Sequence, residues 1–105
     1  MSKPYVIKLS PSAIEDLKEA ANWYSSRLSE GLGVRFLKEV DKSIIELSIV
    51  PGKGSIRYEN IRCTMINKFP YLIHYRIDEQ TKTVKVEALI HTSRDTEIWK
   101  NRTSR

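Results

Sequence analysis

Basic and imidazole side chains gather between Arg62 and Arg94, and their types suit phosphodiester chemistry. The motif His91-Thr-Ser-Arg94 closes the last apolar run of the chain. A histidine can act as an acid or a base near neutral pH, and an arginine can hold a phosphate through its forked guanidinium. The pair is therefore a candidate for phosphate chemistry. A polar cap at a strand end is the alternative, because one histidine and one arginine at short spacing also occur by chance.

Alternating apolar and polar positions predict three consecutive β-strands around these residues, at Ile61–Asn67, Tyr71–Asp78 and Val84–His91. Because side chains alternate across a strand, one face of the sheet should be polar. The residues expected on that face are Arg62, His74, Arg76, Lys85, Glu87 and His91, with Arg94 where the chain leaves the sheet.

The length of the polar loop between the last two strands predicts their register. It sets Arg76 opposite Lys85 and His74 opposite Glu87, with Arg62 close to Arg76 across the neighbouring pair. Cations on adjacent strands repel each other unless an anion lies between them or water solvates them. The pattern thus predicts an anion-binding face, and a solvated face on which His74 pairs with Glu87 is the alternative, which we favour for His74.

The segments before this stretch are expected to position it. Tyr5–Leu9 is a short β-rich run, and Ser10-Pro11 is a typical helix start, because serine caps the first turn and proline needs no amide partner there. Two amphipathic helices should follow, joined by the Ser29–Gly33 segment and ended at Pro51. Their apolar stripes are Ile14, Leu17, Ala21, Tyr24 and Leu28 in the first helix and Phe36, Leu37, Val40, Ile44 and Leu47 in the second.

This order predicts a single α+β domain over residues 1–105, with an N-terminal strand and a two-helix hairpin on a three- to four-stranded, mainly antiparallel sheet. Ser55–Glu59 is either a short strand or an extended lead-in, and 94–105 is a tail that is partly helical or frayed. Trp23 and Tyr24 are interpreted as helix–sheet packing and Cys63 as a buried apolar residue.

Composition narrows the class of protein. The net charge of +5 suits an anionic partner such as nucleic acid or an acidic protein segment, although plain solubility explains it equally well. The single cysteine excludes an internal disulfide and a cysteine-based zinc site, and nothing in the sequence implies a metal ion or a cofactor. No apolar run is long enough to span a membrane, so a cytoplasmic protein without membrane contact is expected.

Several local patterns, in a shared order and spacing across nearly the whole chain, resemble the RelE/ParE family of type II toxin–antitoxin toxins, and its ParE-like side in particular. The patterns are Leu9-Ser-Pro-Ser-Ala13 before Asp16-Leu17, Trp23-Tyr24, Phe36-Leu37, Pro51, Ile61-Arg62, Phe69-Pro-Tyr71-x-Ile73-x-Tyr75, His91-x-x-Arg94-Asp95, Trp99 and Arg102.

The resemblance implies a plasmid-stabilisation type of toxin that a cognate antitoxin neutralises and that meets operator DNA only through that antitoxin. A ParE-like member would poison DNA gyrase and have no catalysis of its own, which we favour by a small margin. A RelE-like member would instead cut mRNA on the ribosome, with Arg62 and Arg94 as phosphate-facing cations and His91 as the acid or base. A degenerate member of the family would serve only as a binding module and would not be toxic. Contacts to the target or to an anion would come from Arg62, His74, Arg76, Lys85, Arg94 and Trp99.

Overall fold

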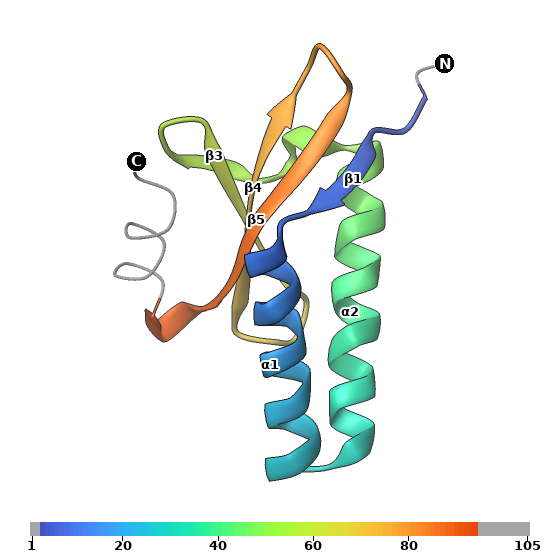
Figure 1. The fold of residues 1–105 in the computed structure, drawn as a ribbon, viewed down its shortest axis with the longest axis vertical. Coiled ribbons are helices and arrows are strands. Elements are labelled where there is room, and N and C mark those ends of the chain that lie inside the picture. Colours follow the sequence, from blue (N-terminus) through green and yellow to red (C-terminus); the bar gives the residue numbers. More distant parts are fainter. Residues whose placement is uncertain (1–2, 95–105) are drawn as a thin grey trace.

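A computed structural model describes residues 3–94. In it, two antiparallel helices cover one face of a single sheet (Figure 1). The tail and its Trp99 lie outside the described residues, apart from Arg94. None of the described helices is long and apolar enough to cross a lipid bilayer. The elements are β1 (Val6–Leu9), α1 (Pro11–Arg27), α2 (Glu30–Ile49), the 3₁₀ turn η1 (Pro51–Lys53), β2 (Ser55–Tyr58), β3 (Ile61–Met65), β4 (Tyr71–Asp78), β5 (Thr83–His91) and the 3₁₀ turn η2 (Thr92–Arg94).

Serine side chains start both helices. The Ser10 hydroxyl accepts the Ala13 amide at 3.0 Å before the expected Pro11, and the Ser29 hydroxyl accepts the Leu32 amide at 3.2 Å. The helix connection is therefore shorter than predicted, because α2 already begins at Glu30 and its first turn includes Gly31 and Gly33.

The sheet has five strands in the order β1-β5-β4-β3-β2. β1 pairs with β5 in parallel and the other neighbours are antiparallel, so the sheet is mixed. The predicted α+β class and helix hairpin are confirmed. The sheet is larger than expected because the Ser55–Tyr58 segment forms an edge strand and β1 joins the same sheet.

A bulge in β5 divides the pairing of β4 with β5 into two registers. Tyr75 pairs with Val86 but His74 pairs with Ala88, which leaves Glu87 as one extra residue on β5. Because an extra residue shifts the alternation by one position, the side chains that follow it change face. The predicted pairing of His74 with Glu87 was therefore wrong, whereas the pairing of Arg76 with Lys85 is confirmed.

The bulge also reverses the predicted faces of the second half of β5. Leu89 belongs to the core cluster under the helices, and His91 is the partner of Tyr71, which packs against that same cluster. His91 was expected on the polar face with Lys85 and lies instead on the helix side. No periodicity within β5 reveals this change, because the mismatch exists only relative to β4.

The core lies between the helix hairpin and the sheet. Its centre includes Phe36, Leu47, Ile73, Tyr75 and Val84, which are all buried. The predicted helix stripes were too wide, since Ile14, Leu28 and Leu37 are exposed. Apolar positions at helical spacing thus overstate how much of each helix surface the sheet covers.

Candidate functional site

The end of β5 turns back on itself and fixes the orientation of His91. In the η2 turn, the Thr92 amide donates to the Pro70 carbonyl at 2.9 Å, which holds the turn against the start of β4. The Ser93 amide then donates to His91 Nδ1 at 3.1 Å, with the Ser93 hydroxyl at 2.9 Å from the same nitrogen. An amide can only donate, so this bond assigns the proton of the neutral imidazole to Nε2. His91 is therefore a hydrogen-bond donor through Nε2.

Aromatic rings surround this imidazole on the helix side of the sheet. The Tyr71 ring meets the His91 ring edge to face, with centroids 5.1 Å apart. Tyr24 of α1 contacts Tyr71 at 6.3 Å and Trp23 at 5.3 Å between ring centroids. The prediction that these two α1 residues are both core holds only for Tyr24, because Trp23 is about half exposed. The result is an aromatic wall that ends at the surface with Trp23.

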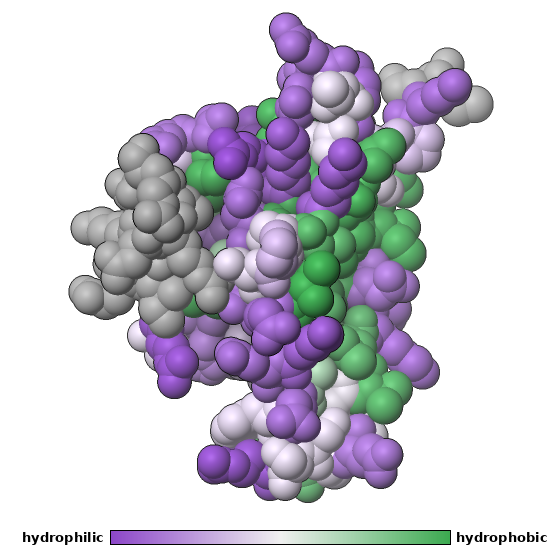
Figure 2. Space-filling model, in the orientation of Figure 1, coloured by the Kyte–Doolittle hydropathy of each residue, from purple (hydrophilic) through white to green (hydrophobic). Residues whose placement is uncertain are grey.

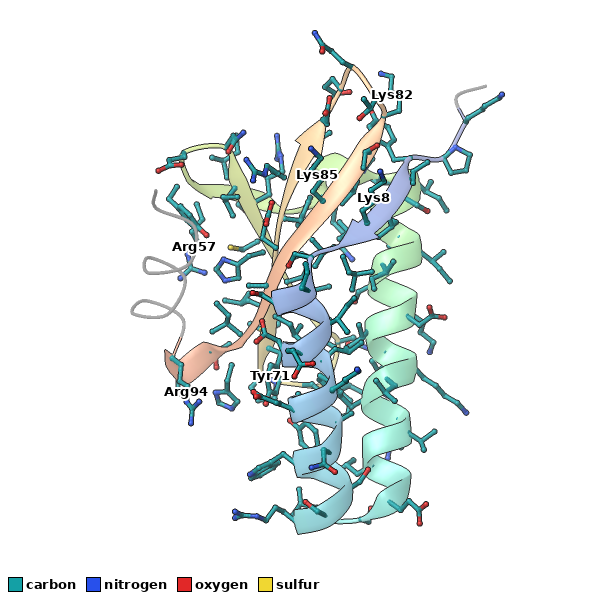
Figure 3. The ribbon with its side chains drawn as sticks, viewed as in Figure 1. Lys8, Arg57, Tyr71, Lys82, Lys85 and Arg94 are labelled. Atoms are coloured by element: carbon teal, nitrogen blue, oxygen red, sulfur yellow. The ribbon has the colours of Figure 1, made fainter. Side chains whose placement is uncertain are left out.

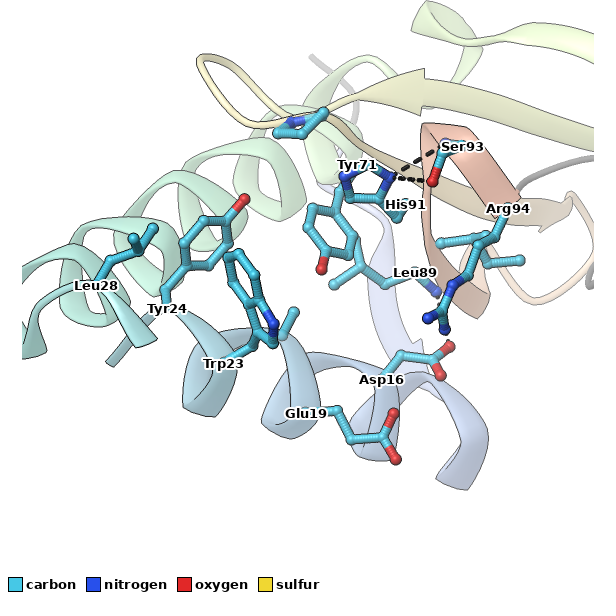
Figure 4. Close-up of a pocket in the computed structure, with 13 residues that line it drawn as sticks. Asp16, Glu19, Trp23, Tyr24, Leu28, Tyr71, Leu89, His91, Ser93 and Arg94 are labelled. Carbon is cyan, nitrogen blue, oxygen red and sulfur yellow. Dashed lines mark hydrogen bonds between the residues drawn. The ribbon is translucent and has the colours of Figure 1, made fainter. Parts of the chain in front are cut away.

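Two carboxylates of α1 face the same end of β5. The Asp16 carboxylate accepts the Leu89 amide at 3.0 Å. β1 pairs with β5 only as far as Val86, so Asp16 provides the acceptor for an amide that β1 does not reach. Figure 4 shows the Arg94 guanidinium pointing toward Asp16, with Glu19 one turn further along α1. The sequence motif around His91 is thus joined to a helix about 75 residues earlier in the chain.

Together these side chains line a surface cavity of about 640 Å³. Burial raises the pKa of Tyr71; Tyr24, Asp16 and Glu19 raise it further, and Arg94 lowers it, so all four act on the same phenol. The cavity offers donors from His91 and Arg94, an aromatic wall and two carboxylates (Figure 4). Its lining is Asp16, Glu19, Ala20, Trp23, Tyr24, Leu28, Pro70, Tyr71, Leu89, Ile90, His91, Ser93 and Arg94.

Arg62 does not line this cavity. It was expected beside Arg76 on the polar face, but its partner across β4 is Tyr75, whose ring is in the core. Arg62 Nη1 donates to the carbonyl of Gly54 at 2.7 Å and lies 3.5 Å from that of Gly52. The expected position was wrong because Arg62 shares the helix side with Ile66, which follows β3 and lies in the core, whereas Cys63 pairs with His74 on the other face. Arg62 therefore caps the loop that follows α2.

The remaining cations of the polar face have carboxylate partners. Arg76 Nε lies 2.8 Å from Glu87 Oε2, and Lys85 Nζ lies 3.8 Å from Asp78 Oδ2. Figure 3 shows Lys85 well away from Arg94, at the other end of β5. These diagonal ion pairs offset the repulsion between neighbouring cations, because each cation already lies next to a protein carboxylate. The repulsion therefore does not require a bound anion.

His74 is buried, at 0 % exposure, on the face away from the helices. Its Nδ1 lies 3.4 Å from both the Cys63 sulfur and the Tyr58 hydroxyl. The expectation of a solvated His74 was wrong, and Cys63 is buried as predicted. A fully buried ring cannot touch a partner without movement of its neighbours, so its position favours a structural role.

Of the predicted site residues within 3–94, only His91 and Arg94 line this cavity. The structure adds Asp16, Glu19, Trp23 and Tyr71, which sequence reasoning did not combine with them. The spacing of Asp16, Glu19 and Trp23 places them on one side of α1, and this was the only available signal. No group of three or more potential metal ligands occurs within residues 3–94.

A family model and several solved structures are similar to this chain. The family model described as the ParE toxin of the type II toxin–antitoxin system parDE matches residues 7–96. No curated protein sequence matches the chain. Among solved structures, the chromosomal ParDE system from P. aeruginosa is similar with a TM-score of 0.73 and 15% identity, covering 86% of this chain and 98% of that one.

Two RelBE structures are also similar. The RelBE2 toxin–antitoxin complex from Mycobacterium tuberculosis has a TM-score of 0.60 and 20% identity, covering 84% of this chain and 98% of that one. The intact RelBE complex from E. coli has a TM-score of 0.59 and 12% identity, covering 81% and 93%. At these identities the likeness of the structures extends to the fold alone.

Proposed function

The chain belongs to the ParE toxin family of type II toxin–antitoxin systems, and we propose that it is a ParE-like toxin that poisons DNA gyrase by protein contacts, without catalysis of its own. The resemblance noted in the sequence is thereby confirmed at the level of the family. The same proposal includes a cognate antitoxin, since the similar structures include toxin–antitoxin complexes.

The observation that carries the proposal is the separation of the candidate catalytic groups. Cleavage of RNA by its own 2′-hydroxyl needs a base, an acid and cations around one phosphate. Arg62 and His91 pair with residues of β4 that are four positions apart, Tyr75 and Tyr71, which is about 13 Å along the strand. The buried Ile73 lies between these two rows on the same side of the sheet. One phosphate would not reach both groups.

The charge of the cavity lining also favours a protein target over an RNA substrate. Among the described residues that line the cavity, Asp16 and Glu19 face the single cation Arg94, so this part of the lining carries one negative charge when His91 is neutral. Two carboxylates beside the phosphate site would oppose the charge of an RNA backbone. An exposed tryptophan and an exposed arginine next to a partly buried tyrosine and histidine are instead the kind of surface that anchors protein partners.

Ribosome-dependent mRNA cleavage is the second candidate, and one observation favours it. His91 presents Nε2–H as a donor on the same cavity as Arg94, which suits protonation of a leaving oxygen next to a cation. In that case His91→Ala should lose at least about 100-fold in cleavage rate. Under the gyrase proposal the same variant keeps its toxicity to the extent that its fold is retained.

Two parallel assays test the proposal. The purified chain is added to gyrase with relaxed plasmid, and separately to a translating extract whose transcript ends are mapped. We expect inhibited supercoiling, accumulation of cleaved DNA–gyrase complex and intact mRNA. Codon-phased cuts with unaffected gyrase would refute it in favour of the nuclease. If strong expression without an antitoxin leaves growth unaffected, the chain is a binding-only member and both toxic mechanisms fail.

A further inference from the structure

We propose that two copies of this chain associate through the solvent-facing ridge of α2, packed antiparallel about a two-fold axis at the middle of the helix. The α2 ridge comprises Val34, Lys38, Asp41, Ile45 and Ile49. This contact is separate from the cavity at the end of β5 and does not depend on the identity of the toxin's target.

Three of the five residues of the α2 ridge are apolar, on a helix face where solvated residues should be polar. It lies opposite the buried positions Phe36, Val40 and Leu47 of the same helix. Val34 is 47 %, Ile45 52 % and Ile49 65 % exposed. The side of the molecule that α2 occupies in Figure 1 shows hydrophobic surface in Figure 2. Single exposed apolar residues are ordinary, but these recur along one line of the helix.

The order of residues along this ridge is self-complementary. α2 runs from Glu30 to Ile49, so its midpoint falls between Glu39 and Val40. A second helix related by a two-fold axis at that midpoint sets Val34 opposite Ile45 of the second copy and Lys38 opposite its Asp41. Each pair occurs twice because the axis repeats it. Two ion pairs at the centre are then flanked by two apolar pairs.

The spacing fits the packing geometry of antiparallel helices. Val34, Lys38, Asp41 and Ile45 follow steps of four, three and four residues, which is the alternation of d and a positions in a heptad. Antiparallel packing brings a positions of one helix next to d positions of the other, and the pairs above obey this rule. A helix of 20 residues is about 30 Å long, so the whole of α2 can take part.

Charge identifies a second copy as the occupant. Among the described residues neither Lys38 nor Asp41 has an ion-pair partner, since the ion pairs of α2 join Lys42 to Glu39 and Lys53 to Glu46. A purely apolar partner would leave both ridge charges unpaired, and a partner of one charge sign would attract one and repel the other. An antiparallel copy satisfies both at once.

The association should be weak and reversible. Helix-on-helix contact along about 30 Å is at the low end of specific interface sizes, so we expect a dissociation constant of about 10 µM. The cavity stays accessible in the dimer, because α1 lies between α2 and the η2 turn (Figure 1).

A charge exchange tests the proposal. Sedimentation equilibrium of the full chain from about 1 to about 200 µM would follow Lys38→Asp, Asp41→Lys and the double variant. Each single variant replaces two attractive pairs by two repulsive ones, which should raise the dissociation constant about ten-fold. The double variant restores opposite charges across the axis, so it should return to within about three-fold of the original value.

Lys8→Asp is the matched control. It makes the same charge change on β1, where the neighbours Ile7 and Leu9 pack on the core and Lys8 points to the other face of the sheet. It should leave the dissociation constant unchanged, and circular dichroism should show every variant folded. The proposal is overturned if the unaltered chain stays monomeric throughout, if the single variants have no effect, if the control weakens the dimer equally, or if the double variant does not recover.

Discussion

Replacing Gly33 by alanine tests how closely the two helices approach. A Cβ at this position would lie 1.9 Å from the Ser25 hydroxyl oxygen and 2.8 Å from the Ala21 carbonyl oxygen, both on α1. The serine hydroxyl can rotate away. The carbonyl belongs to the helix backbone, so the helices must separate or shift along their whole contact.

Two opposing effects set the size of this change. Alanine gains up to about 1 kcal/mol over glycine from its helix propensity. Overpacking in a tight contact costs about 1–3 kcal/mol. Because one of the two close atoms is backbone, we expect the upper half of that range and a net loss of about 1–2 kcal/mol for Gly33→Ala.

Gly31→Ala provides the matched control on the same helix. No atom lies within 4 Å of its Cβ position, so only the propensity term remains and the free energy of unfolding should rise by up to about 1 kcal/mol. Urea unfolding followed by circular dichroism would measure both variants. They should differ by about 2–3 kcal/mol with opposite signs. A Gly33→Ala chain as stable as the Gly31→Ala chain would refute the close approach.

Three further predictions concern other contacts. Tyr75→Phe should lower the free energy of unfolding by about 1–3 kcal/mol in urea titrations, because the Tyr75 hydroxyl accepts the Gly54 amide at 2.9 Å and donates to the Pro51 carbonyl at 2.7 Å; an unchanged midpoint would contradict this. Asp16→Ala should destabilise by about 1.5–3 kcal/mol through loss of the acceptor for the Leu89 amide, and Asp16→Asn, which keeps an acceptor, should lose less; equal losses would show that this bond is unimportant. The pKa of Asp78 is lowered, chiefly by the Thr81 amide, so its contribution exists above the unfolded pKa and disappears as pH falls through the folded one. Asp78→Asn should therefore flatten the loss of stability below about pH 4 in acid unfolding curves, and an identical acid limb would rule out this contribution.

The candidate site could be predicted only in part. The motif at His91 and Arg94 was recognised from its residue types, and both side chains do share one cavity. Their neighbours Asp16 and Trp23 were not recognised as part of the site. Residues on an earlier helix carry no signal of which strand end they will face. Arg62 was grouped with them by alternation alone, and β3 turned that side chain toward the helix side instead.

Local patterns in the sequence by themselves determined the element types, the start of the first helix, the register next to the β4–β5 loop and the family. Each depends on interactions between residues near in the chain, such as the Ser10 cap and alternation within one strand. Tertiary structure alone decided the parallel pairing of β1 with β5, the bulge at Glu87 and hence the face on which His91 lies. A bulge is a mismatch between two strands, so neither strand's own sequence contains it. The placement of the site therefore followed from strand pairing and not from the motif.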